Sequence, residues 1–230
     1  MKIAKLVSAF AGLVLGASAL QANAIPFEVD ITVDNSYALY YGTETTATNF
    51  VGSNGSWYEA EHYSFNLPSS NFIYVVTESD VATAQGFLAQ FTNLLTNQRF
   101  YSNDSQWQVT ATGRRGLAPY NGSAAALAEL SSQLIAANNN SNPSGGWVDT
   151  TAGAANGASP WGTIANIDPN ARWSWYNSNG SVDPTIGGFD HNEYLIFRIS
   201  VGAAEVPEPS TVILLSLGLL GLVAVRKRKA

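Results

Sequence analysis

An uncharged apolar segment near the end of the chain, residues 211–225, most limits the structures that this sequence can adopt. As a helix it would span about 22 Å, short for a permanent anchor but sufficient for a transient one. Pro207, Glu208 and Pro209 precede it, and two prolines hold the backbone in an extended conformation that cannot join a helix. Four cations follow the segment: Arg226, Lys227, Arg228 and Lys229. Because such cations stay on the cytoplasmic side of a membrane, we expect the apolar segment within residues 206–230 to form a transmembrane helix, with the preceding chain outside.

This order resembles the PEP-CTERM sorting signal of Gram-negative bacteria, in which Pro207, Glu208 and Pro209 would be the motif. The resemblance implies that an exosortase, a membrane-embedded transpeptidase-like protease, removes the tail. It also implies sorting in cells that make extracellular polysaccharide. The alternative is an ordinary anchor at the carboxyl end with a chance Pro-Glu-Pro sequence. A sorting signal identifies where a protein is sent, whereas its activity depends on the rest of the chain.

The beginning of the chain has the pattern of a secretory signal peptide. Two lysines precede an apolar run over residues 6–20, and Ala22 and Ala24 supply the small residues of a cleavage site. We predict that signal peptidase cleaves before Ile25, so that residues 1–24 do not belong to the fold. An uncleaved amino-terminal anchor is the alternative.

Between these two segments, residues 25–205 have the length of one ordinary domain with its own core. They contain five arginines, no lysine and sixteen carboxylates, which gives a formal net charge of −11. Nucleic acid is excluded as a partner, because binding phosphates requires a basic face. The chain has no cysteine, so its stability must come from burial without disulfides, and thiol catalysis and cysteine-ligated metals are excluded.

Alternation of apolar and polar residues predicts that this domain is mainly β. The pattern is clearest over residues 27–33 and over residues 192–201, where Leu195, Phe197 and Ile199 fall on one face. Further strands are expected at residues 37–42, 56–59, 63–67, 71–77, 86–91, 106–112 and 171–176. Short strands separated by Asn, Gly and Ser predict an antiparallel β-sandwich. At the level of pattern, the domain resembles the jelly-roll, galactose-binding-like domains of exported bacterial proteins.

Two segments depart from the strand pattern. The apolar run over residues 71–77 lacks alternation, so we expect a central strand that is buried on both faces. Residues 123–137 have Ser123 as a plausible N-cap and leucines at helical spacing, which predicts one helix packed on the sandwich. Residues 138–159 are rich in Asn, Gly and Ser, which is typical of a long surface loop.

The sequence offers few candidates for catalysis. His62 and His191 each lie beside carboxylates and could form a shared metal site or a carboxylate–histidine base, but exposed turn residues are the simpler interpretation. Calcium could bind an Asp-rich turn over residues 183–190. No nucleophile elbow and no phosphate-binding glycine motif occurs. We therefore predict no enzyme, no cofactor and no metal, and a secreted hydrolase is the less favoured alternative.

Six tryptophans and ten tyrosines are the more informative feature, because sugar rings stack on indoles. Trp147 and Trp161 border the predicted loop and are the candidates for exposure, although most of the tryptophans should fill the core. The sequence thus predicts an exported surface or extracellular-matrix protein with a structural or adhesive role beside exopolysaccharide. A carbohydrate-binding module is the alternative. The implied partners are signal peptidase, exosortase, the inner membrane and extracellular polysaccharide.

Overall fold

A computed structural model describes most of the predicted exported domain. The described residues are 24–68, 70–78, 84–114, 121–177, 185 and 194–201. The predicted signal peptide apart from Ala24, and the whole of residues 206–230, lie outside this part of the chain. Among the described residues, no helix combines the length and the apolar character needed to cross a membrane.

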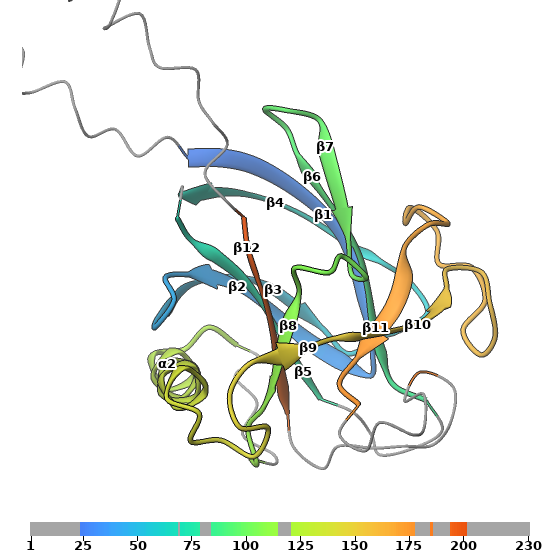
Figure 1. Ribbon diagram of the computed structural model, residues 1–230. Coiled ribbons are helices and arrows are strands. Elements are labelled where there is room, and N and C mark those ends of the chain that lie inside the picture. The colour runs from blue at the N-terminus through green and yellow to red at the C-terminus, as the bar shows by residue number, and fades with distance from the viewer. Residues whose placement is uncertain are drawn as a thin grey trace, which may run out of the picture.

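Two antiparallel sheets pack against each other, which confirms a mainly β fold and is consistent with the predicted β-sandwich (Figure 1). The first sheet has the order β10-β11-β6-β1-β4, with β7 beside β6. Its strands are β1 (Ala24–Asp34), β4 (Glu61–Pro68), β6 (Gly86–Asn93), β7 (Gln98–Tyr101), β10 (Thr151–Ala155) and β11 (Arg172–Trp175). The second sheet has the order β3-β2-β5-β12-β8-β9. Its strands are β2 (Ser36–Gly42), β3 (Ala47–Asn54), β5 (Phe72–Glu78), β8 (Gln108–Ala111), β9 (Val148–Asp149) and β12 (Leu195–Ser200).

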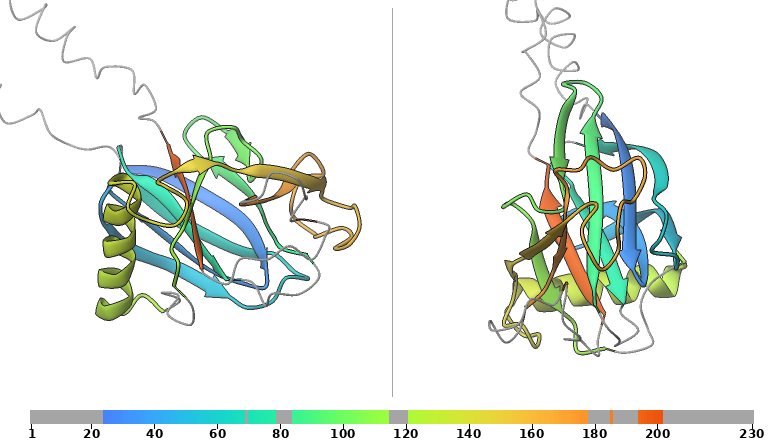
Figure 2. Two further views of the ribbon diagram at one scale, coloured as in Figure 1. Left: turned by 60° about the horizontal axis from the view of Figure 1, so that its bottom comes forward. Right: turned by 90° about the vertical axis from the view of Figure 1, so that its right-hand side faces the viewer.

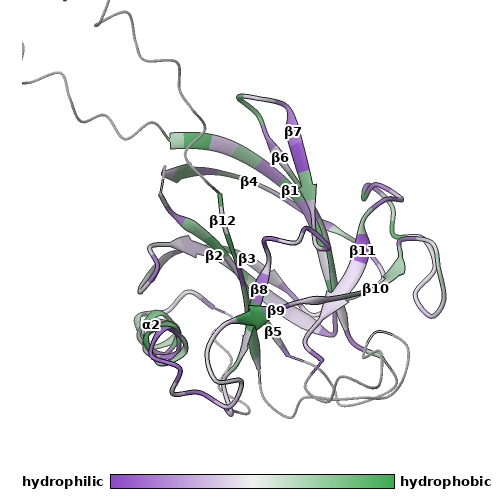
Figure 3. Ribbon diagram, in the orientation of Figure 1, coloured by the Kyte–Doolittle hydropathy of each residue, from purple (hydrophilic) through white to green (hydrophobic). Residues whose placement is uncertain are grey.

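The main core lies between the sheets and follows from the alternation along β1, which is visible in Figure 3. Phe27, Val29 and Ile31 are fully buried in this core, whereas Glu28 and Asp30 between them are partly exposed. A strand with this pattern can satisfy its apolar face only against a second layer. The predicted strand over residues 27–33 is therefore confirmed.

Strand β5 lies between β2 and β12 and contributes to two cores at once. Ile73 and Val75 face the core between the sheets, while Tyr74 and Val76 belong to a second core on the other side of the same sheet. All four side chains are fully buried. The prediction of a central strand buried on both faces is confirmed.

The second core is closed by α2 (Ala124–Asn138), which covers the outer face of the second sheet (Figure 2). The Ser123 hydroxyl accepts a hydrogen bond from the Ala126 backbone N–H at 3.2 Å, so it is the N-cap that the sequence predicts. Leu130 and Leu134 point into the core and are fully buried. The predicted helix and its packing on the sheet are confirmed.

Two local predictions were wrong. The expected strand at residues 56–59 is instead a loop between β3 and β4. The Thr32 hydroxyl donates to the Trp57 carbonyl oxygen at 2.9 Å, so this loop is held by a side chain and not by a strand ladder. Residues 138–159 are not a continuous surface loop, because β9 and β10 form within them.

A third apolar cluster holds the segment after β10 in a defined conformation. Here the segment from Asn156 to Ala171 lies on the outer face of the first sheet and buries Ile164 and Ile167. The Asn156 amide donates to the carbonyl oxygens of Ile164 and Ile167 at 3.0 and 2.8 Å and accepts from the Ile164 N–H at 2.8 Å. One buried side chain thus satisfies backbone groups that would otherwise need water.

The docking of α2 can be tested with two neighbouring residues. Replacing Leu134 with Ala should lower the free energy of unfolding by about 2–5 kcal/mol, because it opens a cavity in the second core. The matched control is Ile135→Ala, since Ile135 is 47% exposed. Its effect should stay within about 0.5 kcal/mol. Denaturant titration followed by tryptophan fluorescence measures both values, and equal effects would contradict this packing of the helix.

Candidate functional site

Trp147, a predicted sugar-stacking residue, is partly buried between α2 and the second sheet. The Arg198 guanidinium lies 3.9 Å from the centroid of its ring system and covers one face of the indole. The indole N–H donates to Asn138 Oδ1 at 2.7 Å, and Arg198 Nη1 donates to the same oxygen at 3.1 Å. A sugar could stack on that face only if it displaced Arg198, and binding at Trp147 stays a prediction.

Trp161, the second predicted sugar-stacking residue, is only 7% exposed. Its ring stacks on Trp173 with 4.0 Å between centroids and 19° between planes, and its N–H donates to Asp34 Oδ2 at 2.7 Å. The expected exposure of Trp161 was wrong, because its segment folds back on the first sheet and uses the indole as core. Sequence alone did not reveal this contact, since Asp34 lies far from Trp161 in the chain.

The two histidines are not brought together by the described part of the chain. His62 Nδ1 lies 2.9 Å from Asp30 Oδ1 across the β1–β4 pair, with the imidazole largely exposed. His191 lies outside the described residues, as do residues 183–184 and 186–190 of the Asp-rich turn that was considered for calcium. Among the residues that are described, no group of three His, Asp or Glu side chains is arranged to hold a metal ion.

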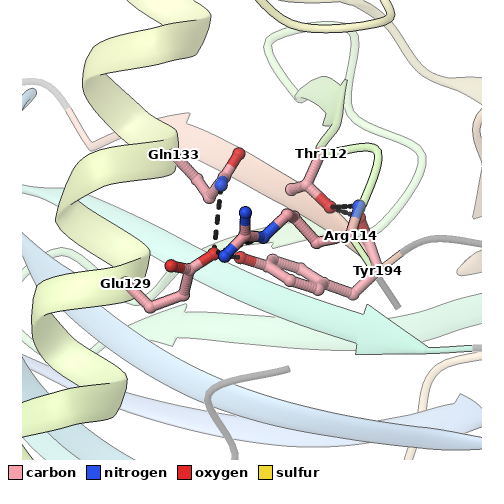
Figure 4. Close-up of polar contacts among 5 residues, drawn as sticks. All are labelled: Thr112, Arg114, Glu129, Gln133 and Tyr194. Carbon is pink, nitrogen blue, oxygen red and sulfur yellow. Dashed lines mark hydrogen bonds and ion pairs between the residues drawn. The ribbon is translucent and has the colours of Figure 1, made fainter. Parts of the chain in front are cut away.

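Donors from three segments converge on the carboxylate of Glu129 on α2 (Figure 4). Glu129 Oε1 accepts from the Tyr194 hydroxyl at 2.9 Å and from Gln133 Nε2 at 3.0 Å, and it lies 3.4 Å from Arg114 Nε. The carbonyl oxygen of buried Tyr194 accepts from the Thr112 hydroxyl at 2.7 Å. These bonds hold α2 to the start of β12 and the end of β8, which is a positioning role.

An open depression of about 380 Å³ lies where β2 begins and β3 ends. It is lined by Ser36, Tyr37, Ser53, Asn54 and Gly55. Asn54 also donates its amide to the Glu61 carboxylate and accepts from the Ser56 N–H at 2.9 Å. Hydroxyl and amide groups of this kind are suited to small neutral polar ligands such as sugar hydroxyls.

Tyr37, which lines the depression, is paired with Tyr63. The Tyr37 hydroxyl donates to the Tyr63 hydroxyl oxygen at 3.2 Å. Burial raises the pKa of Tyr37 far above its usual value, and the hydrogen bond to Tyr63 raises it further. Burial also raises the pKa of Tyr63. Both hydroxyls therefore stay protonated at neutral pH and cannot act as bases. The Tyr37 proton is used in the bond to Tyr63, which leaves the Tyr63 proton free for another acceptor.

Tyr58 lies three residues beyond Gly55 on the β3–β4 loop and is 66% exposed, the most exposed of the large apolar side chains that are described. Tyr58 was not among the candidates predicted from the sequence, because a strand was expected at residues 56–59. The signal was available: turn-forming residues over 53–56 directly precede Trp57 and Tyr58, which is typical of an aromatic pair presented on a loop.

Comparison with known proteins bears on the end of the chain. Residues 205–229 match the family described as the PEP-CTERM protein-sorting motif. This match confirms the resemblance based on Pro207, Glu208 and Pro209. No curated protein and no solved structure matches the chain, so the jelly-roll resemblance is not confirmed.

The buried tyrosine pair predicts how stability depends on pH. A tyrosine whose pKa is raised in the folded state keeps its proton above about pH 10, where the unfolded chain loses it, so stability falls as pH rises through that range. In Tyr37→Phe, the free energy of unfolding should decrease less steeply with pH than in the wild type, by up to about 1.4 kcal/mol per pH unit between about pH 10 and pH 11. Urea titrations across this range measure the slope.

The control for this measurement is Tyr58→Phe, because its exposed hydroxyl meets water in both the folded and the unfolded states. The control should keep the wild-type slope. An unchanged slope for Tyr37→Phe would mean that the Tyr37 hydroxyl is accessible to solvent in the folded protein.

Proposed function

We propose that this protein is an exported, non-catalytic surface or extracellular-matrix protein with a structural or adhesive role beside exopolysaccharide. The main support for this proposal is the match of residues 205–229 to the PEP-CTERM protein-sorting motif. That motif implies an exported protein that is anchored in the membrane and processed by an exosortase. The proposed order is cleavage by signal peptidase after Ala24, anchoring by residues 206–230, removal of the tail, and release of the domain.

The physical character of the domain supports this role. Residues 25–205 carry a strong negative charge, which favours solubility outside the cell, and they have no cysteine to oxidise. Three apolar clusters bury both faces of the second sheet and part of the outer face of the first sheet. A scaffold closed in this way is suited to a structural role.

The hydrolase alternative gains no support from Glu129 or from the His62–Asp30 pair. Glu61 accepts from the Asn54 amide beside the depression, but no carboxylate is among the described residues that line it. Glu129 is engaged by Tyr194, Gln133 and Arg114, and these contacts position a helix. His62 is exposed and pairs with Asp30 on the outer face of the first sheet, away from the depression beside Tyr37. A general acid or base would instead be expected in a concave site.

Cell fractionation with Glu208→Ala tests the sorting pathway. Because Glu208 is the charged centre of the motif, the variant should accumulate as uncleaved precursor in the inner membrane, while the wild type is shortened and leaves it. Immunoblots of membrane, periplasmic and external fractions measure the distribution. Glu59→Ala, on an exposed loop of the domain, is the matched control and should be processed like the wild type. Identical processing of Glu208→Ala would reject the proposed pathway.

Carbohydrate binding is the second candidate function, and the observation that favours it is the exposed Tyr58, three residues beyond Gly55 of the polar depression. An exposed ring can stack on a sugar face while nearby hydroxyl and amide groups bind sugar hydroxyls. This arrangement needs no displacement of Arg198, in contrast to stacking on Trp147.

Affinity electrophoresis through gels that contain the host's own exopolysaccharide tests this second function. Tyr58→Ala should weaken retardation by about tenfold, because it removes the stacking surface. Ile135→Ala also removes an exposed apolar side chain, but on α2, and should migrate like the wild type. Equal retardation of Tyr58→Ala and the wild type would reject sugar binding at this loop. The structural role would then remain as the proposed function.

A further inference from the structure

Both ends of the described domain leave from the same end of the sandwich (Figures 1 and 2). Ala24, at the start of β1, pairs with Pro68, and Ser200, at the end of β12, pairs with Phe72. Pro68 and Phe72 flank a single tight turn, in which the Asn71 N–H donates to the Pro68 carbonyl oxygen at 3.1 Å. We name this the terminal end, and the opposite end, with Tyr58, the distal end.

The β6–β7 turn lies at the terminal end and presents two leucines to solvent. The Leu94 N–H donates to the Pro26 carbonyl oxygen at 2.9 Å, which places the turn beside the start of β1. Leu94 is 40% exposed and Leu95 is 55% exposed. Asn93 Oδ1 accepts from the N–H groups of Leu95 and Thr96 at 2.9 and 3.3 Å, so the turn has a defined conformation.

Charge is distributed unevenly between the two ends. The distal end carries four described carboxylates, Asp34, Glu59, Glu61 and Glu78, against one described arginine, Arg114. At the terminal end, residues 94–97 and 70–71 carry no charge, and Glu44 is the one carboxylate on the described turns there. Arg99 is exposed on β7 close to the leucines. The terminal end is therefore the part of an acidic domain that an anionic lipid surface repels least.

We propose that the terminal end faces the outer leaflet of the inner membrane in the unprocessed precursor, with Leu94 and Leu95 inserted at the lipid headgroup boundary. Apolar side chains on a rigid turn gain free energy by entering this boundary, and a nearby arginine can contact lipid phosphates. Two leucines alone would bind weakly. Attachment to a membrane anchor raises their effective concentration at the surface, which makes weak insertion sufficient. This step rests on the proposed anchoring by residues 206–230.

The length of the connecting chain permits this orientation. Ten residues, 201–210, separate the end of β12 from the apolar segment, and they can span at most about 36 Å. Strand β1 alone, with 11 residues, is about 36 Å long. With the terminal end against the lipid, Tyr58 is held about one strand length above it, so the two ends differ clearly in their distance from the bilayer.

The absence of cysteine in this chain permits a direct test. Leu95→Cys and, as the matched control, Tyr58→Cys each provide one exposed site for an environment-sensitive nitrobenzoxadiazole label. The full chain is reconstituted in phosphatidylethanolamine and phosphatidylglycerol vesicles with nitroxide-labelled lipid. We expect blue-shifted emission and several-fold stronger quenching at residue 95 than at residue 58. Equal quenching, stronger quenching at residue 58, or no quenching at either site would overturn the proposal.

A second variant separates insertion from mere proximity. With the label at Thr96→Cys, replacing Leu94 and Leu95 with Ser should return the emission towards that of water and reduce the quenching. Unchanged emission and quenching would show that the leucines do not insert, and would overturn that part of the proposal. These vesicles contain no exosortase, so the absence of quenching would reject membrane insertion without bearing on the sorting pathway. Normal processing of Glu208→Ala in cells would instead reject the sorting pathway.

Discussion

The structure depends on burial of the second sheet on both of its faces. Along β5, Ile73 and Val75 enter the core between the sheets, while Tyr74 and Val76 enter the core beneath α2. A chain without cysteine has no covalent alternative to such packing. Any movement of β5 would disturb both cores at once, so the sandwich, the helix and the flanking strands form one interdependent unit.

This burial determines which surfaces are free to act. Aromatic rings on the outer faces of the two sheets are covered by other side chains. Trp161 stacks on Trp173 over the first sheet, and Arg198 lies over the Trp147 ring on the second sheet. The exposed apolar residues that bear on function are then at the two ends of the sandwich, Tyr58 on a loop at one end and Leu95 on a turn at the other. The proposed sugar binding therefore depends on the distal end, and the proposed membrane contact depends on the terminal end.

Local pattern was a good guide wherever the residues that decide an element are neighbours in the chain. The alternation over residues 27–33 and the cap at Ser123 each predicted an element correctly, because hydrophobic period and capping act within a few residues. The predicted strand at residues 56–59 failed because the partner that holds this loop, Thr32, lies in another strand. The order within residues 138–159 was missed for the same reason, since β9 and β10 gain their hydrogen bonds from β8 and β11.

The presence of a sorting signal could be inferred from sequence alone, because the Pro207-Glu208-Pro209 motif, the apolar segment and the basic end are local features, and the family match agrees with that inference. Which aromatic rings are exposed could not be inferred. Trp161 is buried because it meets Asp34 and Trp173, and those contacts exist only after the sheets assemble. The gathering of Ala24 and Ser200 beside one turn is likewise a product of strand pairing. Pairing over long sequence distances is a tertiary property, which no local pattern contains.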